Sequence, residues 1–263
     1  MIKINNLSFN YKKDKKILHN INLKIKKGTI TGLIGSNGSG KSTLLKTISK
    51  IYKLSNENNG SIEIMDENIM NINYRQLSKL VGFLDQGNSI TNIVYESIKV
   101  EKFIAFGKYN RKGLFDKYDE EDLLEVKNIM IELKIEHLYG EEIDKLSGGE
   151  LQKVFITKVL LQDTPIILFD EPFNNLDITF QNDLISIIKK LREKGKTVII
   201  AMHEIDIAIN ECDAIVLLEN GTIKYEGAKD DFIYKVINKK IDSDLLKFEI
   251  FKYDEKWYIK KYF

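Results

Sequence analysis

The sequence is poor in cysteine, proline and arginine, and it has no long hydrophobic run. Cys212 is the only cysteine among 263 residues, which excludes an internal disulfide and a cysteine zinc cluster and suits a reducing compartment. The first residues, MIKINNLSFN, lack the apolar stretch of a secretory signal, and no apolar run approaches the roughly 20 residues that a membrane helix needs. We therefore expect a soluble chain, which could still dock on a membrane protein.

Positive and negative charges are nearly balanced. Lysine supplies almost all of the positive charge, because the only arginines are Arg75, Arg111 and Arg192, and the formal net charge is +1. A balance so close to zero gives no general attraction to nucleic acid or acidic membranes, so we expect no nucleic-acid partner. Hydrophobic residues make up 43% of the chain and there are only 2 prolines, so most of it should fold around a packed core.

Strand-like and helix-like segments alternate along most of the chain. Apolar, strand-like segments at 29–34, 165–169 and 197–202 are separated by segments with helical periodicity. This alternation predicts an α/β fold with a mainly parallel sheet that is covered on both faces. Two further strand-like segments, at 7–11 and 17–25, predict an N-terminal antiparallel β subdomain beside that sheet.

We interpret residues 1–240 as one domain with a helical insertion at about 88–160. Asn220-Gly221 suits a two-residue type I′ turn and predicts a hairpin near the end of this domain. The alternating tail predicts a second hairpin, which forms a C-terminal extension over 241–263. Within the insertion, one apolar stripe at helical spacing is formed by Leu123, Val126, Met130 and Leu133.

A glycine-rich loop directly follows the first apolar strand of the predicted parallel sheet. Residues 35–43 read GSNGSGKST and fit the pattern G-x-x-x-x-G-K-[ST] between a strand and a helix. Glycine lets the backbone turn its N–H groups toward phosphate oxygens, and the following helix directs its positive end at the same anion. The residues predicted to bind nucleotide phosphates are Gly35, Ser36, Asn37, Gly38, Ser39, Gly40, Lys41, Ser42 and Thr43.

Individual residues of this loop have distinct expected roles. Lys41 can reach the β- and γ-phosphates of ATP, and the Ser42 hydroxyl can ligate Mg²⁺. A phosphate loop also needs a second metal ligand and a group that activates water, and PIILFDEP supplies two carboxylates at the end of a buried strand. We expect Asp170 to hold Mg²⁺, directly or through water, and Glu171 to orient or deprotonate the attacking water. Alone, this stretch could be a strand followed by an acidic turn.

A second glycine pair occurs in LSGGELQK, residues 146–153. Ser147 and Glu150 form a capping box, and Gly148 and Gly149 leave the first N–H groups of the helix open to an anion. Read locally, this is a well-capped helix, although two glycines lower helix propensity by roughly 1 kcal/mol each. A second anion-binding surface is explained if it faces the nucleotide of another molecule.

These three stretches together resemble the Walker A, Walker B and signature motifs of the ATP-binding subunits of ABC transporters. The resemblance implies the ABC ATPase fold, a P-loop NTPase, and ATP hydrolysis coupled to transport. It also implies a head-to-tail dimer with a second copy or a homologous cassette, in which each ATP lies between two subunits. Further partners would be integral membrane permease subunits and, indirectly, a substrate-binding protein, so the chain would lie at the cytoplasmic face of the cell membrane.

The resemblance assigns roles to four further residues. Gln86 matches the Q-loop glutamine, which in the family touches Mg²⁺ and water, and Asp177 matches the aspartate of the D-loop. His203 matches the switch histidine, which contacts the γ-phosphate. Tyr11 lies where the family stacks an aromatic ring on adenine. The implied catalytic set is thus Lys41, Gln86, Glu171 and His203, and the implied metal ligands are Ser42, Gln86 and Asp170.

The stretch after Gln86 resembles that of importers for metal chelates, meaning ferric siderophores, haem and cobalamin. Lys108 stands at the family's basic position, Asn110 where proline is frequent, and Gln181 matches the end of an LD-x-x-x-Q pattern. Import of zinc or manganese remains an alternative. A soluble ABC ATPase that acts on nucleic acid or ribosomes is a further one, although the segment before Leu146 is too short for long paired helices. The intact motifs argue against an inactive cassette that serves only as a scaffold.

Overall fold

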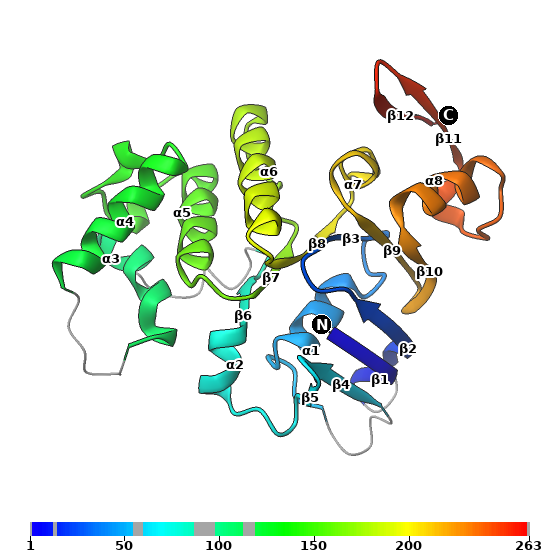
Figure 1. Cartoon of the computed structure of the whole chain (residues 1–263), viewed down its shortest axis with the longest axis horizontal. Coiled ribbons are helices and arrows are strands. Elements are labelled where there is room, and N and C mark those ends of the chain that lie inside the picture. The colour runs from blue at the N-terminus through cyan, green and yellow to red at the C-terminus, as the bar shows by residue number, and fades with distance from the viewer. Residues whose placement is uncertain (1, 13–14, 55–59, 87–97, 113–118, 262–263) are drawn as a thin grey trace.

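A computed structural model describes residues 2–12, 15–54, 60–86, 98–112 and 119–261. Its centre is a six-stranded sheet in the order β10-β9-β3-β8-β7-β6 (Figure 1). All neighbours in this sheet run parallel except the outer hairpin pair β9 and β10. The strand bounds are β3 (Ile30–Ile34), β6 (Val81–Leu84), β7 (Ile166–Asp170), β8 (Thr197–Met202), β9 (Ala214–Glu219) and β10 (Thr222–Ala228).

The central strands are apolar because both of their faces are covered. Every residue of β3, β7 and β8 is buried. Alternate residues of β7 serve two separate cores: Ile167 and Phe169 pack with the larger one, and Ile166 and Leu168 with the smaller. Among the helices whose buried residues join the larger core are α5 (Gly148–Leu161), α6 (Ile178–Glu193), α7 (Ile205–Glu211) and α8 (Lys229–Ile237).

The smaller core lies under a four-stranded antiparallel sheet in the order β2-β1-β4-β5. Helix α1 (Lys41–Ile48) contributes buried residues to this core, and α2 (Tyr74–Leu80) contributes Leu77. The strand bounds are β1 (Ile2–Lys12), β2 (Lys15–Ile25), β4 (Ser61–Ile64) and β5 (Glu67–Asn68). The predicted fold, a mainly parallel sheet beside an N-terminal antiparallel one, is confirmed.

A helical subdomain lies at the opposite end of the molecule from the C-terminal tail (Figure 1). Before α5 it contains α3 (Val100–Ala105), the 3₁₀ helix η1 (Phe106–Asn110), α4 (Glu120–Glu132), and the short 3₁₀ turns η2 (Glu136–Leu138) and η3 (Ile143–Lys145). Part of the predicted insertion, 88–97 and 113–118, lies outside the described residues.

The predicted apolar stripe of the insertion is partly wrong. Val126, Met130 and Leu133 are buried, but Leu123 is 37% exposed. Asp122 takes the inward position one residue earlier, at the i, i+4 spacing that leads to Val126. Two lysines pair with its carboxylate, so a charged residue lies where the sequence pattern suggests leucine.

The chain ends in a hairpin of β11 (Phe248–Tyr253) and β12 (Lys256–Lys261), which follows the 3₁₀ turn η4 (Asp244–Leu246). The Asn210 side chain on α7 bonds both backbone groups of Trp257, at 2.9 and 3.0 Å. At the other predicted hairpin, Asn220 and Gly221 have φ of 47° and 71°, as a type I′ turn requires. The boundaries 1–240 and 241–263 stay predictions. Among the described residues, no helix has the length and hydrophobicity to cross a membrane.

Candidate nucleotide site

The glycine loop joins the end of β3 to the start of α1. A Cβ atom on Gly35 would lie 2.3 Å from the Leu218 carbonyl oxygen, so only glycine fits against β9 at this point. Gly40, the N-cap of α1, has φ of 108°, in the left-handed region. No side chain caps α1. Its first N–H groups are therefore available to an external anion, as in other phosphate loops.

The Lys41 side chain is directed into the centre of this loop. It is only 4% exposed, and Nζ donates to the carbonyl oxygens of Gly35 at 2.8 Å and Ser36 at 3.2 Å. Burial lowers the pKa of Lys41, while the negative charges of Glu171 and Asp170 act in the opposite direction. A buried ammonium at the focus of open N–H groups is suited to bind phosphate.

Ser42 and Asp170 meet although 128 positions separate them. Ser42 Oγ donates to Asp170 Oδ1 at 3.0 Å, and Asp170 is fully buried. Burial raises the pKa of Asp170 to about 6; the Ser42 hydrogen bond opposes this rise and the Glu171 charge adds to it. Asp170 Oδ2 has no hydrogen-bond partner among the described residues. A buried carboxylate oxygen without a partner, beside a hydroxyl, fits the oxygen ligands that Mg²⁺ prefers.

Glu171 follows directly, and three segments of the chain converge on its carboxylate. Oε1 lies 2.5 Å from His203 Nε2 and 3.9 Å from Lys41 Nζ. Oε2 accepts hydrogen bonds from Gln86 Nε2 and, at 2.7 Å, from Asn174 Nδ2. The four predicted catalytic residues therefore come together around one buried carboxylate, which is 7% exposed.

The backbone of Glu171 is strained. Its φ is 52°, unusual for a residue with a side chain, and its N–H donates to the Ala201 carbonyl oxygen on β8 at 2.9 Å. This turn directs the carboxylate away from the strand and toward Lys41 and His203. Asn174 was not among the predicted site residues, although an amide three residues beyond Glu171 was a signal present in the sequence.

The residues of the signature stretch have separate surroundings. Ser147 caps α5, Glu150 completes the predicted capping box, and both Ser147 and Gly148 are exposed. A Cβ on Gly148 would meet no atom within 4 Å, whereas one on Gly149 would lie 3.0 Å from the Asn175 carbonyl oxygen. Since α5 belongs to the helical subdomain and α1 packs under the antiparallel sheet (Figure 1), the N-terminal ends of these two helices lie on different parts of the molecule.

Two further predicted residues hold contacts within the protein. Asp177 is the N-cap of α6, and its second carboxylate oxygen pairs with Lys153 Nζ at 2.8 Å. That hydrogen bond lowers the pKa of Asp177. Tyr11 is 54% exposed; its hydroxyl lies 2.9 Å from Thr43 Oγ1 and its ring packs edge-on against Tyr52. Tyr52 was not among the predicted site residues.

The remaining residues of the predicted phosphate loop fall into two groups, one buried and one exposed to solvent. Ser39 and Thr43 are buried, and Ser39 Oγ has no hydrogen-bond partner within the described part of the chain. The exposed positions of the loop are Ser36, Asn37 and Gly38.

Residues 18–174 match the family model described as ABC transporter. The chain is 35% identical over 234 residues to the petrobactin import ATP-binding protein YclP of Bacillus subtilis (strain 168), with 89% of each chain covered. It is 33% identical to the ferric enterobactin transport ATP-binding protein FepC of Escherichia coli (strain K12), covering 82% of this chain and 78% of that one. Identity to the manganese transport system ATP-binding protein MntB of Halalkalibacterium halodurans is 27%, with 94% of both covered.

Solved structures show the same fold. A dimeric ATP-binding cassette in a post-hydrolysis state, bound to ADP and Pi, is 28% identical with a TM-score of 0.76, and the match covers 87% of this chain and 99% of that one. The cbiO1 subunit from Clostridium perfringens is also 28% identical, with a TM-score of 0.72 and coverage of 90% and 93%. The chain therefore belongs to the ATP-binding subunits of the ABC transporter family, and it is an ATPase.

Proposed function

We propose that this chain is the ATP-hydrolysing subunit of an importer for iron chelates of the siderophore type. The relatives named for petrobactin and enterobactin carry this proposal. Manganese import is the second candidate, because the relative named for it matches 94% of the chain, at a lower identity of 27%. Haem and cobalamin remain possible cargoes in this proposal, because the sequence resembles importers for metal chelates as a class.

The convergence on Glu171 supports the catalytic part of the proposal. Lys41 would neutralise charge on the β- and γ-phosphates, and the open N–H groups at the start of α1 would hold the remaining oxygens. Glu171 would accept a hydrogen bond from the attacking water, orient it and take its proton. His203 and Gln86 already contact that carboxylate and would orient it, and His203 would also contact the γ-phosphate. Phosphoryl transfer to water depends mainly on such positioning and charge stabilisation.

The donor set beside Glu171 fits Mg²⁺. Ser42 Oγ, the unpartnered Asp170 Oδ2 and the side-chain oxygen of Gln86 would hold the ion. When bound, Mg²⁺ supplies positive charge to the phosphate oxygens. A proton can compete with Mg²⁺ for the Asp170 carboxylate. The raised pKa of Asp170, about 6, leaves this carboxylate mostly ionised at pH 7.

The open signature helix supports a composite ATP pocket. Ser147 and Gly148 are exposed at a helix start, yet they belong to a different part of the molecule from Lys41. A second copy or a homologous cassette, turned head to tail, would place its own signature stretch against the ATP held by this chain. Asp177 and the neighbouring Ile178, which is 77% exposed, would lie near the interface between the two subunits. ATP then holds the subunits together, and its hydrolysis weakens their association.

The proposed transport role places this chain at the cytoplasmic face of the membrane, bound to integral membrane permease subunits, and requires a substrate-binding protein that delivers the cargo. Uptake of radioactive iron by cells with and without the intact chain tests it. We expect uptake of ferric siderophores to fall to background in cells that carry Glu171→Gln, while manganese uptake stays normal. The reverse pattern would favour the manganese alternative. Purification of the chain with bound nucleic acid and no polytopic membrane protein would contradict a transport role.

A further inference from the structure

The 3₁₀ helix η1 lies where three parts of the protein meet. The side-chain amide of Asn110 donates two hydrogen bonds, to the carbonyl oxygen of Ser78 and to that of Gln162, both at 3.1 Å. Ser78 is in the last turn of α2, and Gln162 is the C-cap of α5. Asn110 therefore connects two backbone segments that are 84 positions apart in the sequence.

These two segments lead directly into neighbouring strands. Helix α2 ends at Leu80 and β6 begins at Val81, while α5 is followed by β7. The strands are paired in parallel from Val81 opposite Ile166 to Leu84 opposite Phe169. Asn110 thus bridges the chain at the entry of this strand pair.

The other end of the same strand pair carries the proposed catalytic contact. Gln86 and Glu171 each lie two residues beyond the last matched pair, and Gln86 Nε2 donates to Glu171 Oε2. One hydrogen-bonded bridge therefore closes each end of β6 and β7. The two backbones are hydrogen-bonded to one another along strands of only four and five residues. We therefore expect a change in their relative placement at one end to affect the other end.

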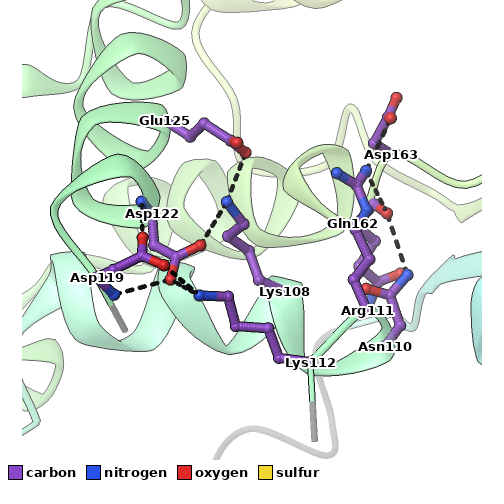
Figure 2. A network of polar contacts seen from close by, with 9 residues as sticks. All are labelled: Lys108, Asn110, Arg111, Lys112, Asp119, Asp122, Glu125, Gln162 and Asp163. Atoms are coloured by element: carbon purple, nitrogen blue, oxygen red, sulfur yellow. Dashed lines mark hydrogen bonds and ion pairs between the residues drawn. The ribbon is translucent and has the colours of Figure 1, made fainter. Parts of the chain in front are cut away.

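A buried ionic network anchors η1 to α4 within the helical subdomain (Figure 2). Lys108 is 5% exposed, and its Nζ lies 2.7 Å from Asp122 Oδ1 and 2.8 Å from Glu125 Oε2 on α4. Lys112 contacts the same Asp122 and pairs with Asp119 at 2.9 Å. Burial alone would raise the pKa of Asp122, but the bonds from the two lysines outweigh it and hold that pKa well below its ordinary value.

The backbone of η1 also packs directly on α5. A Cβ on Gly107 would lie 2.4 Å from the Lys158 carbonyl oxygen, so the two helices touch through their backbones there. Arg111 adds a hydrogen bond from Nη2 to the Gln162 carbonyl oxygen at 3.0 Å and an ion pair with Asp163 at 2.8 Å. Among the described residues, Arg111 forms no hydrogen bond or ion pair with α2, so of these two residues only Asn110 joins both strand entries.

We propose that Asn110 is a positioning residue for ATP hydrolysis, which holds β6 and β7 in the relative placement that lets Gln86 contact Glu171, and that the Lys108–Asp122 pair fixes its segment to α4. The inference rests on the proposed role of Glu171. It gives the helical subdomain a physical connection to the carboxylate that orients water, independent of the signature stretch.

The test compares Asn110→Leu, which keeps the size of the side chain and removes both donors, with Arg111→Met in the purified full-length chain. For Asn110→Leu we expect kcat to fall about tenfold or more while the KM for ATP changes less than about twofold. Arg111→Met keeps the Ser78 bridge and should retain at least about half of the wild-type kcat. A fluorescent ATP analogue, titrated without Mg²⁺, should bind both variants as it binds the wild type.

Wild-type kcat in a folded Asn110→Leu variant would overturn the proposal. An equal loss of kcat in Arg111→Met would also overturn it, because that variant keeps the hydrogen bond from Asn110 to Ser78. If Asn110→Leu does not fold, Lys108→Met replaces it, with Lys108→Arg as the variant that should restore kcat. Glu171→Gln is assayed alongside. If that variant keeps wild-type turnover, the proposed role of Glu171 fails; if it is inactive while Asn110→Leu is normal, only the positioning role fails.

Discussion

His203 and Glu171 are in direct contact in the candidate site, with Nε2 of the histidine 2.5 Å from Oε1 of the carboxylate. His203 follows β8 and Glu171 follows β7, and these strands are paired in parallel. Parallel pairing places both strand ends at one edge of the sheet, where the phosphate loop after β3 also lies. The catalytic arrangement is therefore a product of strand order.

The first prediction concerns Glu171→Gln. The amide keeps the size of the side chain but cannot take a proton from water, so we expect kcat to fall at least about 100-fold. The affinity for ATP should change less than about threefold, because the phosphate contacts remain. Steady-state ATPase assays and titration with a fluorescent ATP analogue measure the two effects. Glu193→Gln, an exposed glutamate on α6, is the control and should be indistinguishable from wild type.

The second prediction tests the composite pocket with Gly148→Trp. A Cβ atom on Gly148 would meet no atom of its own chain within 4 Å, so we expect the indole to extend outward and collide with a facing molecule. We expect this variant and Lys41→Met each to be inactive alone. Mixed in equal amounts, they should recover about a quarter of the wild-type rate, because half of the dimers are mixed and each mixed dimer has one intact pocket.

Differently tagged chains show whether the dimers of that experiment have mixed. Absence of recovery in a preparation in which the two tags co-purify would show that the pocket is not shared between subunits. Full activity of Gly148→Trp alone would show that nothing docks on the signature helix.

The third prediction concerns Tyr11, whose proposed role is to stack on adenine. Tyr11→Phe removes the hydroxyl and its contact with Thr43 but keeps the ring, so ATP affinity should stay within about twofold of wild type. Tyr11→Ala removes the ring, and affinity should fall about threefold to tenfold, the usual worth of an aromatic stack. Isothermal titration with ATP measures both. If the phenylalanine variant loses as much affinity as the alanine variant, the hydroxyl and not the ring is what matters.

The fourth prediction concerns acid stability and Asp122. In the folded state its pKa lies below the ordinary value of 3.8, so the unfolded chain takes up the proton first. The stabilisation by Lys108 and Lys112 is therefore complete above about pH 4 and is lost as the pH falls below that value. Urea unfolding between about pH 5 and pH 2 should show a shallower loss of unfolding free energy in Asp122→Asn than in wild type. Asp242→Asn, at an exposed position, should follow the wild-type curve.

The chemistry of the site could be read in the sequence where it depends on a few consecutive residues. A phosphate loop needs glycines and a lysine within nine positions, and the signature helix needs Ser147 and Glu150 three residues apart, so both are local patterns. Alternation of apolar strands with helices likewise predicted the parallel sheet, since a strand buried on both faces must be apolar throughout. In contrast, the pattern placed Leu123 in the core, where the structure has Asp122.

The sequence by itself determined the phosphate loop, the two Walker B carboxylates, the capping box and the class of fold, because each of these follows from residue types at short spacing. Only the tertiary structure decided that Gln86, Asn174 and His203 meet on Glu171, that Tyr52 packs against Tyr11, and that Asp122 is buried between lysines. These contacts join segments whose mutual placement depends on strand register and helix packing. Both arise from burial summed over the whole core, which no short stretch of the chain contains.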